Sequence, residues 1–305
     1  MFVNVLTQVL ILLILIMLGA LLAKVKMLNN ESIKGMTDLV LYIVTPCVII
    51  KSFVREFDPS LTKKLLLSFT IAFLAHFGYI ILSHLLLHSK MKSQEKVLRF
   101  GTVFANCGFM AIPLLQALIG DLGVFYGTAF IAVFNILVWS YGIVIMSGTV
   151  KSLTPKKLII NPGIIGTVIG LVIFFLNIPI PKIIFEPIAF LAALNTPLPM
   201  IIIGFHLAHS NLLNGLKNIN TILSMILRLI VFPLSVLGVM YLCGIRGEVL
   251  VACTISASVP TAANTTMFAS KYGADTSLSV SMVSLSTILS VITIPIIVTL
   301  AKTIA

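Results

Sequence analysis

The chain has 305 residues, of which 59% are hydrophobic and only 10% are charged, and its mean hydropathy is +1.16. Soluble domains carry roughly 25% charged residues, so this composition excludes a soluble globular protein and indicates an integral membrane protein. The formal net charge of +11 does not indicate a nucleic-acid partner, because the basic residues cluster at the ends of apolar runs, where they contact lipid headgroups and water.

Apolar segments follow one another along the whole chain, each close to the ~20 residues that cross the hydrocarbon core as a helix. The first lacks the basic flank of a signal peptide, and we expect it to be a retained span. No stretch between segments is long or polar enough to form a soluble domain. The sequence predicts an all-α polytopic membrane protein with ten transmembrane helices, at 3–23, 33–54, 63–87, 97–119, 122–147, 160–177, 183–207, 218–243, 248–270 and 276–301.

Basic residues are distributed unevenly between the loops. Odd-numbered loops hold twelve Lys and Arg, among them Lys156, Lys157 and Lys217, whereas the even-numbered loops and the C-terminus hold seven. Because cytoplasmic loops carry the excess of basic residues, we expect the odd loops to be cytoplasmic. Both termini would then lie outside the cytoplasmic (inner) membrane.

The two halves of the chain resemble each other. Val97-Leu98 matches Val249-Leu250 at an offset of 152 residues, and the same offset matches Asn106 with Ser258. Thr45-Pro46 matches Thr196-Pro197 at an offset of 151. Five spans per repeat is an odd number, so the second repeat has to be inserted upside down, as in many secondary transporters. We expect two five-helix repeats, at residues 1–150 and 151–305.

Two stretches interrupt membrane-length segments with polar and helix-weakening residues, at 106–113 and 258–264. Unwound backbone survives at membrane depth only where it is buried in protein or lines a cavity. Paired interruptions in corresponding positions of two halves are the best sequence pointer to a transporter's binding site. These stretches therefore predict the site.

The motifs around these stretches resemble those of the auxin efflux carrier family. The run N-C-G-F-M-A-I-P-L-L from Asn106 to Leu115 is similar to the fourth-span motif of that family, N-x-x-x-M-G-I-P-L-L, with Ala111 in place of Gly. Further similarities run in the same order as in the family: Asn135 with Trp139, Arg228, Pro233, Gly244-Ile245-Arg246-Gly247, Pro260, Phe268-Ala269 and Tyr272-Gly273.

This resemblance implies a ten-helix fold in which the fourth and ninth spans are broken and cross near the membrane midplane. It also implies that one group of helices forms a scaffold and a homodimer, while the group bearing the crossing moves in an elevator-like way. The loop near residues 148–157 is short, so the chain is more similar to the prokaryotic permeases of the family, which are associated with malate, malonate and similar carboxylates.

The candidate site residues suit a carboxylate. The N-terminal ends of broken helices present unpaired N–H groups and partial positive charge, and Pro113 and Pro260 obstruct continuous helical bonding. Asn106 and Asn264 can donate amide N–H groups without carrying a costly charge. The full set of predicted substrate-binding residues is Asn106, Pro113, Pro260, Asn264, Ser258, Thr261 and Asn135, with Thr265 as a further candidate hydroxyl.

Structural roles remain open for the same residues. A proline in a membrane helix is often a packed kink, and an asparagine there often bonds a neighbouring helix. Arg228 is the only basic residue well inside a span, and it can act on the substrate or bond carbonyl groups.

The nine acidic residues fall almost entirely at the ends of spans. A cation/proton antiporter would need carboxylates at midspan, so cation exchange is disfavoured. No P-loop, no Cys/His ligand spacing and no nucleophile–base pairing is apparent. We expect no enzyme activity, no cofactor and no metal.

The sequence as a whole predicts a secondary carrier for small organic anions that works by alternating access. Its partners would be a small carboxylate substrate, the lipid bilayer and a second copy of the chain. A sodium-coupled organic-anion symporter of the bile-acid-carrier type is the alternative within transport. A membrane receptor that binds a ligand without moving it is the alternative from another class.

Overall fold

The computed structural model describes residues 2–153, 160–209 and 218–305, and within these ranges the regular structure is helical, apart from one isolated bridge between two residues. Lys156, Lys157 and Lys217, three of the basic residues used to predict orientation, lie outside the described residues. The protein is therefore an all-helical polytopic membrane protein, as the sequence predicts.

Seven of the described helices, some with an internal irregular turn, are long and apolar enough to cross a membrane: α1 (Phe2–Lys24), α2 to α3 (Asn30–Phe53), α4 (Pro59–Leu86), α7 to α8 (Asp121–Ser147), α11 to α12 (Lys182–Ala208), α14 to α15 (Ile219–Leu242) and α18 (Thr276–Ile304). Three shorter apolar helices are η2 to α6 (Cys107–Ile119), α10 (Pro162–Phe175) and α16 (Gly247–Ser258). Helices α5 (Lys92–Val103) and α17 (Asn264–Lys271) complete the segments that concern the site. Each predicted span overlaps one of these helices or two in succession, and the ten-span inverted repeat stays a prediction.

Polar residues fix where several helices begin. Asn29 and Ser32 form a reciprocal capping box at the start of α2, and the Asp58 carboxylate accepts the Ser60 N–H at the start of α4. Asn161 accepts the Ile164 N–H ahead of α10, where Pro162 occupies the first turn. Because the first N–H groups of a helix have no partner within it, these caps stabilise the boundaries.

Prolines account for most of the irregular turns inside the spans. The π-helical turns η1 (Val40–Val44), η2 (Cys107–Ala111) and η5 (Leu227–Val231) each end two residues before a proline, which is Pro46, Pro113 and Pro233 respectively. Proline lacks an N–H and clashes with the carbonyl group four residues earlier, and a wider turn relieves that clash. The segment predicted as one span at 183–207 likewise divides before Pro197, into α11 (Lys182–Ala193) and α12 (Pro197–Ala208).

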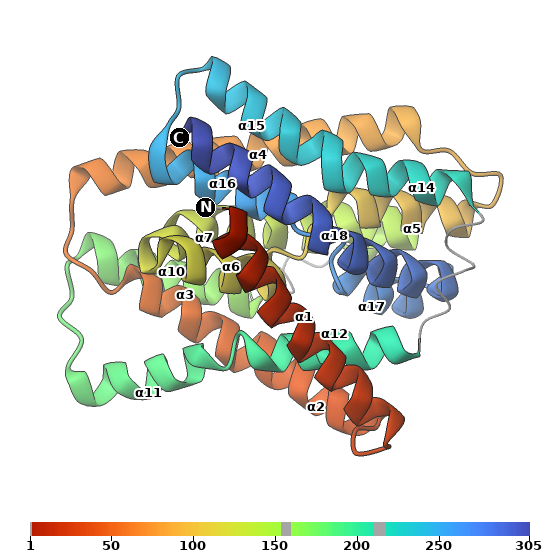
Figure 1. Cartoon of the computed structure of the whole chain (residues 1–305), viewed down its shortest axis with the longest axis horizontal. Helices are drawn as coiled ribbons and strands as arrows, with labels where there is room; N and C mark the ends of the chain where they lie inside the picture. Colours follow the sequence, from red (N-terminus) through yellow and green to blue (C-terminus); the bar gives the residue numbers. More distant parts are fainter. Residues whose placement is uncertain (1, 154–159, 210–217) are drawn as a thin grey trace.

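The centre of the molecule is formed by α6 (Ile112–Ile119), α7 (Asp121–Leu137) and α16, which Figure 1 shows surrounded by the longer helices. Every residue of α16 from Val249 to Ser258 is buried. By contrast, α1, α4 and α11 expose many large apolar side chains, as expected for surfaces that contact lipid. The chain interruptions adjoining α6 and α16 are thus enclosed by protein.

Helices α1 and α12 pack with their backbones almost in contact. A Cβ atom on Gly19 would lie 2.3 Å from the Ile201 carbonyl oxygen, and one on Gly204 would lie 2.0 Å from the Ile16 carbonyl oxygen. Membrane helices use small residues for such close approach, because dispersion contacts rather than the hydrophobic effect hold them together.

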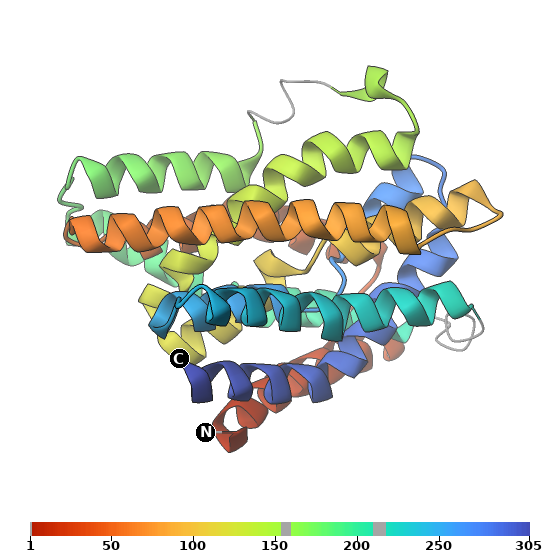
Figure 2. The same ribbon diagram turned by 90° about the horizontal axis from the view of Figure 1, so that it is seen from above.

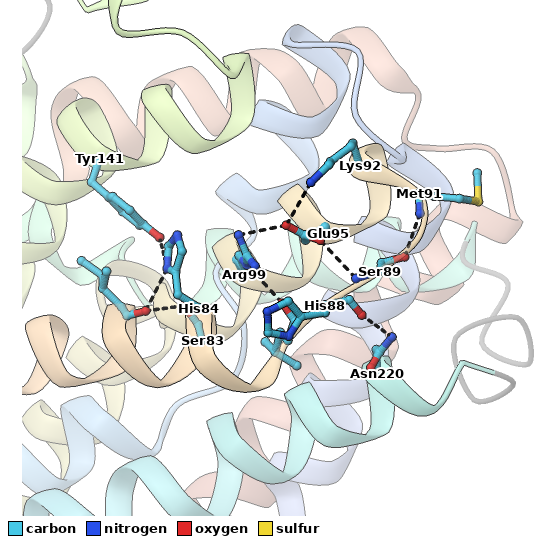
Figure 3. Close-up of polar contacts among 12 residues, drawn as sticks. Ser83, His84, His88, Ser89, Met91, Lys92, Glu95, Arg99, Tyr141 and Asn220 are labelled. Carbon is cyan, nitrogen blue, oxygen red and sulfur yellow. Dashed lines mark hydrogen bonds and ion pairs between the residues drawn. The ribbon is translucent and has the colours of Figure 1, made fainter.

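The two ends of the chain lie close together in both views (Figures 1 and 2), and α1 contacts α18. Polar contacts secure the turn between α4 and α5 (Figure 3). Glu95 accepts from Arg99 at 2.9 Å and from the Ser89 N–H at 3.2 Å. Asn220, at the start of α14 (Ile219–Ile226), donates to the His88 carbonyl at 2.8 Å.

Candidate functional site

The two interrupted stretches meet through their main chains. Helix α5 ends at Val103 and η2 begins at Cys107, while α16 ends at Ser258 and α17 begins at Asn264. Between these helices the chains run antiparallel: the Asn106 N–H donates to the Pro260 carbonyl at 2.8 Å, and the Ala262 N–H donates to the Phe104 carbonyl at 2.9 Å. The backbone groups freed by the two breaks therefore satisfy each other inside the protein.

A cavity of about 70 Å³ lies beside this crossing. Four asparagines from different parts of the chain line it: Asn106 at the first break, Asn264 at the start of α17, Asn135 on α7 and Asn161 at the start of α10. The remaining lining is mainly apolar and aromatic, from Leu41, Tyr42, Phe109, Ile131, Phe134, Trp139 and Met267 among others. None of the side chains that line the cavity in the described ranges is charged.

Asn106 is held at the crossing by its main chain. Only 5% of it is exposed, its main-chain N–H is bonded to Pro260, and its carbonyl accepts the Met110 N–H at 3.0 Å. Its side-chain Nδ2 is buried and has no hydrogen-bond partner among the described residues. A buried amide donor without an acceptor is costly, so this group is suited to an acceptor on a bound molecule.

The amides of Asn135 and Asn161 are partly engaged. Asn135 Nδ2 donates to the Ile131 carbonyl at 2.9 Å, and Asn161 Oδ1 accepts the Ile164 N–H at 3.1 Å. Asn161 is absent from the residues predicted from sequence. The signal that could have found it is the run Asn161-Pro162-Gly163 at the start of an apolar segment, because asparagine before a first-turn proline is typical of a helix N-terminus.

Three helix N-termini adjoin the cavity. Gly108 and Phe109 of η2, Asn264 of α17 and Gly163 of α10 contribute to its lining. The main-chain N–H groups of Gly108 and Phe109 have no acceptor in the described part of the chain. Each helix N-terminus carries a partial positive charge of about half an elementary charge. The cavity thus combines positive helix ends with an unpaired amide, and this arrangement favours an anion.

The other predicted residues lie near the crossing without lining this cavity. Pro260 contributes its carbonyl to the chain pairing. The Ser258 hydroxyl donates to Thr254 within α16, and the Thr261 hydroxyl donates to the Gly101 carbonyl at 3.0 Å. Thr265 is buried, and its hydroxyl lacks a partner among the described residues. Pro113 lines separate hollows beside Gln116 and Thr196.

The residues that pair at the crossing are not those that the repeat offset matches in sequence. The offset of 152 residues matches Asn106 with Ser258, but Ser258 is the last residue of a regular helix. The backbone bonds instead join Asn106 to Pro260 and Phe104 to Ala262, on either side of the antiparallel bridge between Ala105 and Thr261.

Comparisons with known proteins agree on one family. The sequence profile of the membrane transport protein family, which includes the auxin efflux carriers, matches residues 4–298. An uncharacterised transporter of Methanothermobacter thermautotrophicus is 25% identical over 297 residues, which cover 94% of this chain and 95% of that protein. An uncharacterised transporter of Methanocaldococcus jannaschii is 26% identical over 302 residues, with the same coverage of each chain.

Proposed function

The chain belongs to the membrane transport protein family, and from this premise we propose that it is a secondary transporter of small organic anions. The observation that carries the proposal is the buried Nδ2 of Asn106, which has no partner among the described residues, in a cavity bounded by three helix N-termini. An anionic oxygen would accept from this amide and interact favourably with the helix ends.

The uncharged lining bears on the kind of anion. The candidate substrates are mono- or dicarboxylates such as malate and malonate, or auxin-like acids. A second negative charge in the cavity would find no basic side chain among its described lining residues and would be costly to desolvate. The rings of Phe109, Phe134 and Trp139 offer apolar contact instead. This combination favours an anion with a single charge and an apolar body.

The proposed mechanism is elevator-type alternating access. The main-chain bonds between residues 104–106 and 260–262 join the two broken helices, so these helices can move as one unit. The cavity lies between that unit and the residues Tyr42 of η1 and Asn161 ahead of α10. Displacement of the crossing relative to η1 and α10 would carry an anion bound to Asn106 and expose it alternately to the two sides.

The proposed architecture is ten spans in an inverted 5+5 repeat, with the broken fourth and ninth spans crossing. The paired interruptions and the similar bends at Thr45-Pro46 and Thr196-Pro197 support it. The protein would lie in the cytoplasmic membrane with both termini outside and would form homodimers through the helices that do not move. The proximity of the two termini is compatible with an even number of spans.

Transport by purified protein in liposomes tests the function. Uptake of labelled malate, malonate and indole-acetate would be measured with and without imposed proton and sodium gradients. Asn106→Ala should raise the KM about 10- to 100-fold, because the loss of a hydrogen bond to a charged group costs about 1.5–3 kcal/mol. Asn4→Ala, which removes an exposed asparagine of α1, is the matched control. The proposal fails if no anion is taken up in any gradient, and the role of Asn106 fails if its variant keeps the wild-type KM.

A further inference from the structure

Arg228 lies on the side of the crossing formed by helix C-termini. It belongs to η5, between α14 and α15 (Phe232–Leu242), and it is completely buried. No carboxylate of the described residues forms an ion pair with it. An unpaired charge at this depth is expensive, so a specific interaction has to compensate for its burial.

The compensation comes from main-chain carbonyl groups of both broken helices. Nη1 of Arg228 donates to the carbonyls of Thr102 and Val103, each at 3.3 Å, and Nη2 donates to the carbonyl of Ala257. Thr102 and Val103 are the last two residues of α5, and Ala257 is the penultimate residue of α16. One guanidinium group therefore bridges the C-terminal ends of both helices.

These bonds complete the C-terminus of α5. The last four carbonyl groups of a helix have no partner within it. In α5 the Phe100 carbonyl accepts the Phe104 N–H at 3.0 Å, and the Gly101 carbonyl accepts the Thr261 hydroxyl. The remaining two carbonyl groups, those of Thr102 and Val103, accept from Arg228. Among the described residues, each of these four carbonyl groups thus already has a hydrogen-bond donor.

The charges also balance. Each helix C-terminus carries about half a negative elementary charge, so two such ends together correspond to about one. The single positive charge of the guanidinium matches that sum. The rings of Tyr79 and Phe232 lie near it, with their centroids 5.1 Å and 5.5 Å from Cζ. These faces add favourable cation–π interaction and exclude water.

We propose that Arg228 is a resident cation of the crossing, which neutralises the C-terminal ends of α5 and α16 and makes a bound metal cation at this position unnecessary. Anion transport is then independent of sodium and other alkali cations. This inference rests on the proposed anion transport, and it argues against the sodium-coupled alternative. The planar fork of arginine reaches two helices at once, which the single ammonium of lysine cannot reproduce.

Cation replacement in proteoliposomes gives the first test. Initial anion uptake by the wild type should stay within about twofold when Na⁺ is replaced by K⁺ or choline at constant ionic strength, which keeps screening equal. Arg228→Gln should lower uptake by at least about tenfold, because it leaves two helix ends without their charge. A wild-type rate that collapses in choline, or an Arg228→Gln rate equal to that of the wild type, would overturn the proposal.

Melting temperatures of the purified protein give a second test that does not require transport. Arg228→Gln should melt lower than the wild type, and millimolar guanidinium or Na⁺ should raise its melting temperature selectively. Lys302→Gln is the matched control, because Lys302 also donates to a carbonyl at a helix end, that of Leu118, at 3.2 Å. Equal melting of Arg228→Gln and the wild type, or no selective response to any cation, contradicts the assignment.

The two tests separate the two proposals. If no anion is taken up in any medium, the proposed function fails, while the melting comparison still decides the role of Arg228. If Arg228→Gln does not fold, Arg228→Lys is used in the uptake measurement instead. The lysine variant should keep sodium-independent uptake at a reduced rate. An Arg228→Lys rate equal to that of the wild type, or wild-type uptake that requires sodium, would refute the inference.

Discussion

A Cβ atom on Gly163 would lie 2.4 Å from Nδ2 of Asn135. Both residues line the cavity, and the absence of a side chain at the start of α10 leaves room for the Asn135 amide to bond the Ile131 carbonyl. The glycine therefore shapes the candidate site without offering any functional group.

Gly163→Ala is expected to impair transport as well as stability. The added methyl group would displace the Asn135 amide, and a forced repacking of this kind costs about 1–3 kcal/mol. We expect an increase in the KM for the transported anion, measured by concentration-dependent uptake. Gly238→Ala, where the added atom meets nothing within 4 Å, serves as the control. Wild-type kinetics in Gly163→Ala would show that the position of Asn135 does not matter to the substrate.

Asn161→Ala separates capping from substrate contact. The loss of the cap on Ile164 should cost about 1 kcal/mol of stability, as for other N-caps. Asn29→Ala removes the comparable cap of α2, away from the cavity. Both variants should lower the melting temperature similarly, but only Asn161→Ala should also raise the KM. Equal uptake kinetics in the two variants would limit Asn161 to a structural role.

Much of the helix pattern is predictable from local chemistry. Asn29, Pro59 and Asn161 mark helix starts because capping side chains and first-turn prolines act within a few residues. The interruption near Pro260 is predictable because a proline cannot continue the preceding helix, which ends at Ser258. A local rule also explains why the predicted interruption at 106–113 is too long. Pro113 fits the first turn of α6 and does not break the chain there, and the helical structure is interrupted seven residues earlier, at Asn106.

What could not be predicted depends on contacts between distant segments. The cavity brings Asn161 together with Asn106 and Asn264, and their convergence follows from packing that no local pattern records. The pairing of 104–106 with 260–262 uses main-chain atoms, which leave no signature in residue types. The role of Arg228 depends on which helix ends surround it, and its isolation within an apolar span indicated only that it is exceptional.

Gly204→Ala is expected to destabilise the protein by about 1–3 kcal/mol, because the new methyl group would force α1 away from α12. Melting of detergent-solubilised protein, followed by the fluorescence of Trp139, measures the effect. Gly78→Ala on α4, where the added atom meets nothing within 4 Å, should leave stability unchanged or slightly higher. Similar melting of both variants would contradict the close contact of α1 with α12.

The Glu95 cluster predicts an acid-sensitive component of stability (Figure 3). Burial raises the pKa of Glu95, but the Ser89 N–H and the charges of Arg99, Lys92 and His88 outweigh it, and the net pKa is lowered. The stabilisation is therefore fully present above the ordinary glutamate pKa of about 4.3 and is lost as the pH falls through the lower folded-state pKa.

Melting temperatures measured from neutral pH down to below about pH 4 test whether stability falls on acidification as this lowered pKa requires. Glu95→Gln should lower stability near neutral pH and flatten the loss of stability on acidification. Arg99→Ala should cost more than Lys92→Ala, because the Lys92 side chain is 85% exposed and its pair with Glu95 measures 4.0 Å, whereas the Arg99 pair is largely buried. An exposed pair contributes about 0–1 kcal/mol. The cluster has no such role if Glu95→Gln and the wild type respond identically to acid.

The chain pairing at the crossing also constrains biosynthesis. The Phe104 carbonyl and the Asn106 N–H emerge from the ribosome long before Pro260 and Ala262, their partners, have been translated. Until then these polar groups need water or the insertion machinery, since lipid cannot satisfy them. The first broken helix is consequently an unfinished folding unit during most of translation. Its stable burial awaits the second, so membrane integration of the central helices is completed only near the end of synthesis.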